Sequence, residues 1–239
     1  MQLSIPILTG EPNKTKTLST KSGAKRIFQM ADIPVPVGSH DIYDEKKFYE
    51  ELTKLVAQNL YFNSWIFKID DEFEGRGHAS LQVDQIKTVI ELRKRKVDMT
   101  EAIIKKLEEV IVKVVPKKAK IAMPSLYPSW QDYITRFCKV GGVIEAVPLC
   151  APSQIKFPSI SFFIEPNGAT KIIGTFDRIE ANQYVNGGCF FPQKSLPIYD
   201  MDKIAESVSE VLYDKGLIGH VTIDLISFEN PSAKPNDPF

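Results

Sequence analysis

The pattern of apolar and polar positions is clearest over residues 65–83, where two apolar stretches flank a polar segment. The apolar run 65–67 leads to Lys68. Three acidic residues and a turn containing Gly75 and Gly77 follow before the second apolar stretch. Large apolar residues on both sides of a glycine-rich turn are typical of a β-hairpin. We therefore predict a strand, a turn and a returning strand.

Apolar residues recurring every three to four positions predict helices along much of the remaining chain. The expected helices are one capped by Ser19 or Thr20 and reaching Met30, one started by Asp41 or Asp44, three over residues 84–96, 98–115 and 130–138, and one from Asp200 to Gly216. Pro116 should end the helix before it, because proline removes a backbone donor. Helices beginning at side-chain caps are common in globular proteins.

Short β-branched or alternating runs predict strands at residues 120–123, 143–148, 159–164, 171–176 and 220–227. Residues 10–14 are expected to form a polar turn, and residues 183–197 a loop because they are rich in Gly, Asn and Pro. Strands alternating with helices indicate an α+β protein with mixed or antiparallel sheets, in two lobes separated by a cleft.

The order of these elements suggests a division of the chain. We expect a lead-in over residues 1–17, a helical linker over 18–64, a small lobe over 65–147, a large lobe over 148–228 and a polar tail over 229–239. The expected hairpin lies in the small lobe. The large lobe contains the apolar strand that ends at Asp224.

Composition narrows the classes of partner. The 239 residues include 30 Lys and Arg and 30 Asp and Glu, so the chain lacks the positive excess typical of nucleic-acid binding. The basic run 93–96 is interpreted as a solvated helix end. No apolar stretch is long enough to span a membrane. The three cysteines match no zinc or disulfide spacing, so we expect reduced, partly buried thiols in an intracellular, cytoplasmic protein.

Two charged residues lie at strand ends, where they could bind a phosphate group or a metal ion. Lys68, at the end of a strand beside a glycine-rich hairpin, could supply a point charge to a polyphosphate while backbone N–H groups supply donors. The alternative is an exposed lysine before an ordinary hairpin. Asp224 ends an apolar strand, where a carboxylate is costly unless it is paired or bound to a metal such as Mg²⁺.

Four stretches resemble the ATP-grasp family, and they occur in its order. They are residues 18–28 with the linker 32–36, the hairpin residues 65–68 with 74–78, the strand 142–147, and the late strand 216–224. The resemblance covers residues 18–228. It implies an ATP-grasp-like fold with two lobes and flanking helices around a nucleotide cleft, and ATP and Mg²⁺ as ligands.

The resemblance also implies roles for individual residues. Lys21 and Lys68 would grip the ATP phosphates, with Lys25 as an alternative to Lys21. Further roles would belong to the lid turn residues Glu74, Gly75, Arg76 and Gly77, to the hinge residues Glu145, Ala146 and Val147 at the adenine, to Arg178 at the transferred phosphate, and to Asp224 as the magnesium ligand. The alternatives without a ligand are an exposed lysine near a helix start for Lys21, a carboxylate hydrogen-bonded to nearby backbone for Glu145, and a surface ion pair for Arg178.

Residues 176–179, 187–192 and 220–227 resemble more closely the ATP-grasp-like region of the IQ motif-containing H family. The resemblance implies calmodulin as a partner, bound through IQ motifs. This sequence shows no Ile-Gln-x-x-x-Arg-Gly pattern, so we expect those motifs to lie outside this stretch. One expectation is a nucleotide-binding domain derived from a carboxylate–amine or carboxylate–thiol ligase, working through an acylphosphate. The other is a scaffold or regulatory module that kept the fold without turnover.

The end of the chain bears on catalysis. ATP-grasp enzymes place further metal ligands on a strand with a Glu-x-Asn pattern, whereas here Glu229 and Asn230 are followed at once by Pro231. Pro235 and Pro238 also disfavour a paired strand. We therefore expect a fragment or short isoform that binds nucleotide weakly and does not turn over ATP alone.

Overall fold

The computed structural model describes residues 8–95, 98–182 and 185–228. These described residues form two compact units, which we call the hairpin unit (those within 36–149) and the terminal unit (those before 36 and those after 149). Several sequence-based expectations lie outside the described residues: residues 1–7 of the lead-in, Lys96 of the basic run, the first two positions of the loop at 183–197, and the tail 229–239 with its prolines.

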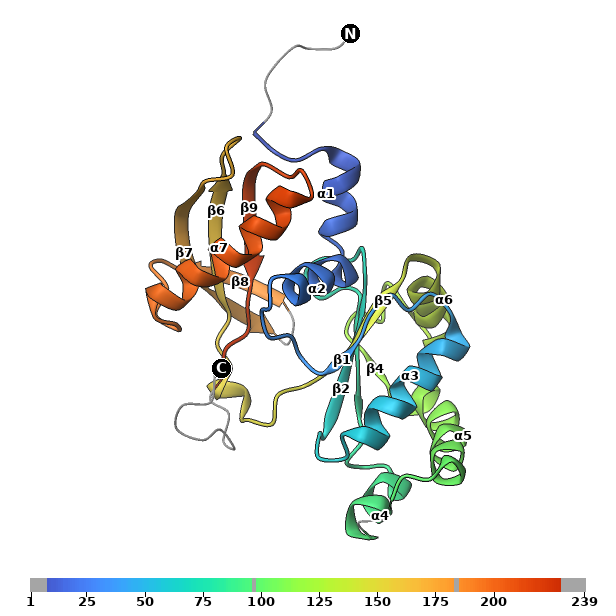
Figure 1. Ribbon diagram of the computed structural model, residues 1–239. Helices are drawn as coiled ribbons and strands as arrows, with labels where there is room; N and C mark the ends of the chain where they lie inside the picture. The colour runs from blue at the N-terminus through green and yellow to red at the C-terminus, as the bar shows by residue number, and fades with distance from the viewer. Residues whose placement is uncertain (1–7, 96–97, 183–184, 229–239) are drawn as a thin grey trace. The chain divides into compact units, whose positions relative to one another are not determined.

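The hairpin unit is built on a five-stranded antiparallel sheet in the order β1-β5-β2-β3-β4. The strands are β1 (Gly38–Ser39), β2 (Ser64–Ile69), β3 (His78–Gln82), β4 (Lys120–Ile121) and β5 (Gly142–Ala146). The predicted hairpin is confirmed as β2 and β3, with Lys68 opposite His78. Strand β2 lies between β3 and β5, so both of its backbone edges are paired. Figure 1 labels β1, β2, β4 and β5 of this sheet.

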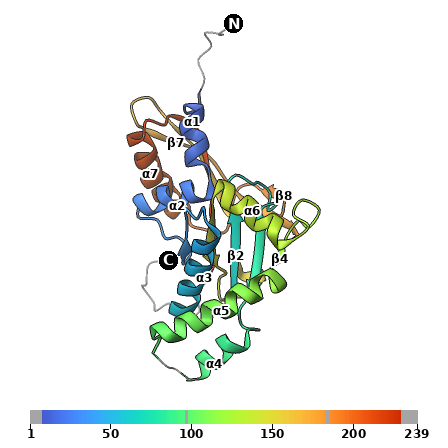
Figure 2. The same ribbon diagram turned by 90° about the vertical axis from the view of Figure 1, so that its right-hand side faces the viewer.

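The described residues of this unit form the helices α3 (Glu45–Gln58), α4 (Lys87–Arg95), α5 (Glu101–Lys118) and α6 (Trp130–Val140). Figure 2 shows α3, α5 and α6 beside the strands. Alternate residues of β2, namely Trp65, Phe67 and Ile69, are fully buried in the core with aromatic residues of α3 and α6. The rings of Phe48 and Phe67 meet edge to face at 4.9 Å, a favourable arrangement for aromatic pairs.

Side-chain caps explain where several helices start, and proline position explains where one predicted helix end is wrong. Asp44 caps α3 by accepting from the Lys47 N–H, and Ser129 and Asp132 form a capping box at α6. The expectation that Pro116 ends α5 is wrong, because the helix continues to Lys118. Proline in the last turn removes one backbone bond there, while the Ala119 N–H still bonds to the Val115 carbonyl at 2.9 Å.

The interpretation of the basic run as a solvated helix end is wrong for Arg93. Its Nε donates to the Leu60 carbonyl at 2.6 Å, and Nη2 donates to the Phe62 carbonyl at 2.6 Å. A third bond runs from Nη1 to the Asn63 side-chain oxygen at 3.1 Å. The guanidinium thereby ties α4 to the loop that delivers β2, whereas its neighbours Lys94 and Arg95 are exposed.

The terminal unit contains a four-stranded antiparallel sheet in the order β8-β7-β6-β9. Its elements are α1 (Pro12–Leu18), α2 (Lys21–Met30), the short 3-10 helix η1 (Pro152–Gln154), β6 (Pro158–Ile164), β7 (Thr170–Asn182), β8 (Val185–Phe190), α7 (Ile198–Asp214) and β9 (Gly219–Asp224). Apolar residues of α7, β6 and β9 share one core with Ile27 of α2. Helix α7 contacts both β6 and β7.

Three expectations for this unit are corrected. The polar turn at residues 10–14 is the start of α1, because Pro12 takes the first helical position and Glu11 accepts the N–H groups of Asn13 and Lys14. These bonds, chiefly the one from Lys14, lower the pKa of Glu11. The loop expected at 183–197 contains β8, which pairs with β7. Helix α7 starts at Ile198, so Asp200 lies in its first turn.

Strand β8 forms one edge of the described sheet, and its end is apolar. Phe190 is 66% exposed and the following Phe191 is 76% exposed. The register between β7 and β8 shifts twice, between Ile179 and Asn182. Among the residues that the structure describes, no helix is long and apolar enough to cross a lipid bilayer.

The three cysteines are free thiols, but they differ in exposure. Cys138 and Cys150 are partly buried as expected, whereas Cys189 on β8 is exposed. Burial raises the pKa of Cys138 to about 11, with smaller contributions from the charges of Glu45 and Asp44. Burial also raises the pKa of Cys150.

We predict that Arg93→Ala lowers the free energy of unfolding by about 1–3 kcal/mol, because three carbonyl-type acceptors lose a charged donor. Arg93→Lys should recover part of this loss, since an ammonium cannot reproduce the planar fork. Lys94→Ala, one residue away and exposed, serves as the control. Urea denaturation monitored by circular dichroism measures all three, and equal midpoints for Arg93→Ala and Lys94→Ala would contradict the prediction.

We also predict that iodoacetamide modifies Cys189 well before Cys138 in the folded chain at pH 8. The thiolate is the reactive form, and a raised pKa keeps Cys138 protonated until the pH approaches 11. Its modification rate should therefore climb as pH increases up to that value. Peptide mass spectrometry follows each site, with the urea-unfolded chain as the control in which the rates converge. Equal rates in the folded chain would refute the assignment.

Candidate functional site

Lys68 and Glu145 form a close ion pair on the sheet of the hairpin unit. The Lys68 Nζ lies 2.5 Å from the Glu145 Oε2, and both side chains are largely buried. Ile66 lies opposite Glu145 across β2 and β5, while Lys68 lies opposite Val143. The lysine and the glutamate are thus diagonal neighbours on one face, a spacing that long side chains can bridge. The pair lies on the face opposite the helix-packed core residues of β2.

The turn that joins β2 to β3 is compact. Glu74 and Gly75 have positive φ angles of 54° and 73°, and glycine takes such angles without a steric cost. The Arg76 and His78 N–H groups donate to the carbonyls of Phe73 and Gly75. Two turn donors are therefore already used, and a phosphate would need to displace these bonds or use other donors.

Gly77 lies where the chain passes close to itself. A Cβ at this position would lie 2.5 Å from the Glu72 Cβ and 2.9 Å from the Ile69 Cβ. Neither neighbouring atom is the end of a flexible side chain, so a larger residue would push the turn apart. The Gly77 carbonyl accepts from the Ile69 N–H at 3.0 Å, which closes the turn.

Aromatic and basic side chains from α6 and the segment before it hold the turn. Tyr133 donates to the Gly77 carbonyl at 3.0 Å, and Tyr127 donates to Glu72 at 2.8 Å. Arg136 binds Asp71 at 2.7 Å. Burial, followed by the hydrogen bond to Glu72, raises the pKa of Tyr127 to about 12, so it stays a donor at neutral pH. The turn is therefore fastened at its base, while Glu74 and Arg76 are exposed.

Two expected hinge residues follow Glu145: Ala146 is the last residue of β5, and Val147 comes directly after it. The Ala146 N–H donates to the Val37 carbonyl at 2.8 Å, and the Val147 N–H donates to the Ser64 carbonyl at 3.0 Å. Both N–H groups are thus committed to neighbouring backbone. A base bound here would meet carbonyl oxygens or side chains before these donors.

Lys21 and Lys25 lie one turn apart on α2 in the terminal unit. Lys21 is the first helical residue, after the cap at Thr20, and Lys25 is buried. Residues at this spacing lie on the same side of a helix. The structure thus places both lysines of the sequence-based alternative on one helix face.

Arg178 and Asp224 meet on the sheet of the terminal unit. The Arg178 Nη1 lies 3.4 Å from the Asp224 Oδ2. Ser159, fully buried on the strand between them, donates to the Asp224 Oδ1 at 2.6 Å. The geometry arises because β6 pairs with both β7 and β9, and Ser159 lies opposite Asp224. The carboxylate is therefore held by two residues from neighbouring strands.

The oxygen ligands at Asp224 suit a hard cation. Mg²⁺ is commonly held by one or two carboxylates together with substrate phosphates, so one aspartate fits the protein's share of such a site. Over residues 8–95, 98–182 and 185–228, no group of three or more His, Cys, Asp or Glu residues could hold a metal ion. A cation at Asp224 would therefore take its remaining ligands from water or from a nucleotide.

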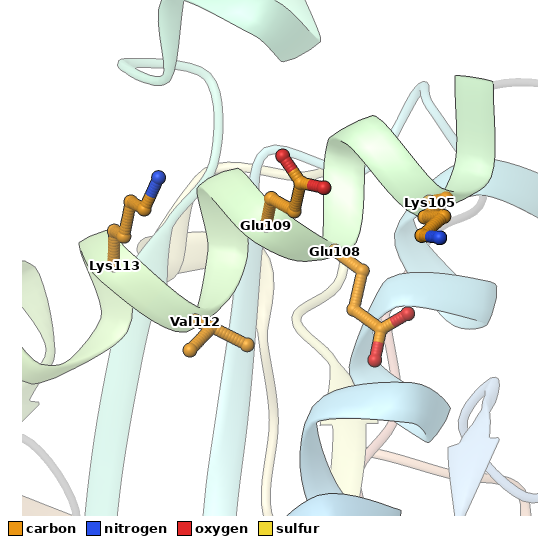
Figure 3. A pocket seen from close by; sticks show the side chains of 5 residues that line it. All are labelled: Lys105, Glu108, Glu109, Val112 and Lys113. Atoms are coloured by element: carbon orange, nitrogen blue, oxygen red, sulfur yellow. The ribbon is translucent and has the colours of Figure 1, made fainter. Parts of the chain in front are cut away.

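A shallow hollow on α5 is lined by Lys105, Glu108, Glu109, Val112 and Lys113 (Figure 3). All five residues come from a single helix. Charged residues recurring along one helix side form a solvated surface, and no residue predicted from the sequence as part of the site lines it. The hollow does not add to the candidate site.

Comparison with known proteins identifies the family. The family model described as "IQCH-like, ATP-grasp" matches residues 12–237. The chain belongs to the IQCH-like ATP-grasp family. IQ motif-containing protein H of Danio rerio is 31% identical over 243 residues, covering 97% of this chain and 23% of that protein. This IQCH-like chain thus spans less than a quarter of the length of that relative.

Solved structures share the fold of the IQCH-like chain. The biotin carboxylase domain of Hydrogenobacter thermophilus 2-oxoglutarate carboxylase, in complex with Mg-ADP, ADP and bicarbonate, has a TM-score of 0.62 at 13% identity, over 93% of this chain and 39% of that one. Campylobacter jejuni biotin carboxylase gives 0.58 at 17% identity, over 93% and 40%. D-alanyl-alanine synthetase A of Vibrio cholerae gives 0.53 at 12%, over 95% and 58%. The α+β, ATP-grasp fold is confirmed.

Three residues that shape these clusters were not predicted from the sequence as part of the site: Ser159, Tyr127 and Tyr133. Ser159 and Ser161 alternate with apolar residues in β6, a pattern that marks one polar sheet face. No sequence pattern marks the two tyrosines, because they lie far along the chain from the turn residues that they contact.

We predict that Tyr133→Phe speeds amide hydrogen exchange in residues 70–78 while exchange in α5 stays unchanged. The Gly77 carbonyl keeps its bond from Ile69, so the cost to global stability should be about 1 kcal/mol or less. Tyr61→Phe, which removes a hydroxyl from an exposed site of the same unit, is the matched control. Unchanged exchange in the turn of Tyr133→Phe would show that this hydroxyl does not restrain it.

Proposed function

We propose that this chain binds a nucleoside triphosphate with Mg²⁺, using Lys68 and the neighbouring turn for the phosphates. The observation that carries the proposal is the Lys68–Glu145 pair beside the glycine turn, in a chain of an ATP-grasp family. Glu145 holds the ammonium in one place before a ligand arrives, which reduces the ordering cost on binding. The nucleotides in the biotin carboxylase structures support the same ligand class.

The terminal unit has candidate ligands of its own. Asp224 would supply a carboxylate oxygen to Mg²⁺, and Arg178 is its cationic neighbour. Lys21 and Lys25 offer two further positive charges on one face of α2. When bound, Mg²⁺ would neutralise part of the phosphate charge, and the chain's own residues would orient the phosphates around it.

The second candidate is a non-catalytic interaction module that kept the ATP-grasp fold. It is favoured by the charge arrangement, because an acid already pairs with two of the candidate cations in the structure. Lys68 contacts Glu145, and Arg178 contacts Asp224. A module of this kind would use these pairs to hold strands together and would gain no stability from nucleotide.

Titration with ATP separates the two candidates. If the chain binds nucleotide, Mg-ATP should raise the melting temperature, because a ligand that binds only the folded state stabilises it. We predict that Lys68→Met weakens ATP affinity about tenfold or more, in line with the loss of one charged hydrogen bond of roughly 1.5–3 kcal/mol. Isothermal titration calorimetry measures the affinity.

Two further variants make the result interpretable. Lys54→Met removes an exposed lysine paired with Glu51 on α3, so it controls for loss of a positive charge in the same unit. The double variant Lys68→Met/Glu145→Gln removes both charges and avoids leaving a buried carboxylate without its cation. Affinity in Lys68→Met equal to that of the parent would reject the phosphate role, and no binding by the parent would favour the interaction module.

A further inference from the structure

Both carboxylate oxygens of Asp224 are already engaged by the chain. Oδ1 accepts a hydrogen bond from Ser159 at 2.6 Å, and Oδ2 faces the Arg178 Nη1 at 3.4 Å. The Asp224 side chain is nevertheless 56% exposed, so an ion from solvent can reach it. Any cation that binds this carboxylate meets a guanidinium already in place.

The two contacts differ in strength. The serine bond is short and comes from a fully buried residue. The arginine contact is longer than the 2.7–2.9 Å typical of charge-assisted bonds, so it is the weaker of the two. A cation would therefore displace the guanidinium before it displaced the hydroxyl.

Arg178 has anchors that do not depend on Asp224. Its Nη2 donates to the Leu225 carbonyl at 3.3 Å, and its guanidinium lies 5.8 Å from the centre of the Phe157 ring. Among the described residues, its buried Nε has no hydrogen-bond partner. The guanidinium thus has a place to remain and an unused donor when it leaves the carboxylate.

We propose that Arg178 is the resident counter-cation of Asp224 and that a divalent cation binds this carboxylate by exchange with it. A guanidinium and a divalent ion beside one carboxylate repel each other, so the arginine lowers the affinity for a free cation. Arg178 is then a positioning residue that keeps Asp224 neutralised without metal. This deepens the proposed function by making cation entry at that site a displacement step.

The exchange has a testable sign. A residue that only supports the fold would lower both stability and cation affinity when changed. Arg178→Gln should instead lower the melting temperature slightly while raising the affinity for Mn²⁺, measured without nucleotide by water proton relaxation. The expected gain is about fivefold, the size set by a partly exposed ion pair.

Three variants complete the experiment. Asp224→Asn should weaken Mn²⁺ binding, and Arg178→Gln/Asp224→Asn should lose the gain of the single change. Lys171→Gln removes a positive charge from the same strand, where Lys171 pairs with Glu165, and should leave Mn²⁺ affinity unchanged.

The outcomes are distinct from those of the ATP titration, because no nucleotide is present. A gain in Arg178→Gln that requires Asp224 supports the exchange even if the parent binds no ATP. Equal or weaker Mn²⁺ binding by Arg178→Gln overturns it. A gain of the same size in Lys171→Gln, or parental affinity in Asp224→Asn, overturns it as well.

Discussion

The pairing of β2 with strands on both sides is the constraint on which the hairpin unit depends. Because side chains alternate along a strand, this register sends Trp65 and Phe67 into the helix-packed core and Lys68 to the other face. A shift by one residue would place the lysine in the core and expose the aromatic rings. The same apolar packing that stabilises the unit therefore positions its candidate phosphate ligand.

Two of the candidate cations share one arrangement. Each is paired with an acid from another strand of the same sheet, Lys68 with Glu145 and Arg178 with Asp224. The pairs differ in exposure, since Glu145 is nearly buried while Asp224 is half open to solvent. A buried pair resists separation because a lone charge left behind is costly, whereas an open pair separates more easily. The Asp224 pair is accordingly the one suited to exchange.

Local patterns in the sequence were sufficient for much of the fold. The helices α2, α3 and α6 and the hairpin were predictable because caps, apolar periodicity and turn glycines all act within a few residues. The errors came where the nearest residues in the sequence do not determine the secondary structure. Pro12 resembles a turn residue until Glu11 caps the helix, and β8 becomes a strand through its pairing with β7. Sequence could name Arg178 and Asp224, but their contact depends on strand order.

The apolar end of β8 has a consequence for how the molecule meets its surroundings. An edge strand can recruit other chains through its row of free backbone groups, but a regular row is needed for long pairing. The two register shifts against β7 interrupt that regularity. Attraction at this edge therefore depends on the exposed rings of Phe190 and Phe191. Hydrophobic contacts of these rings act over a short range and do not require a particular strand direction. Self-association at this edge would occur through nonspecific hydrophobic contacts and would give irregular aggregates, not fibrils built by strand pairing.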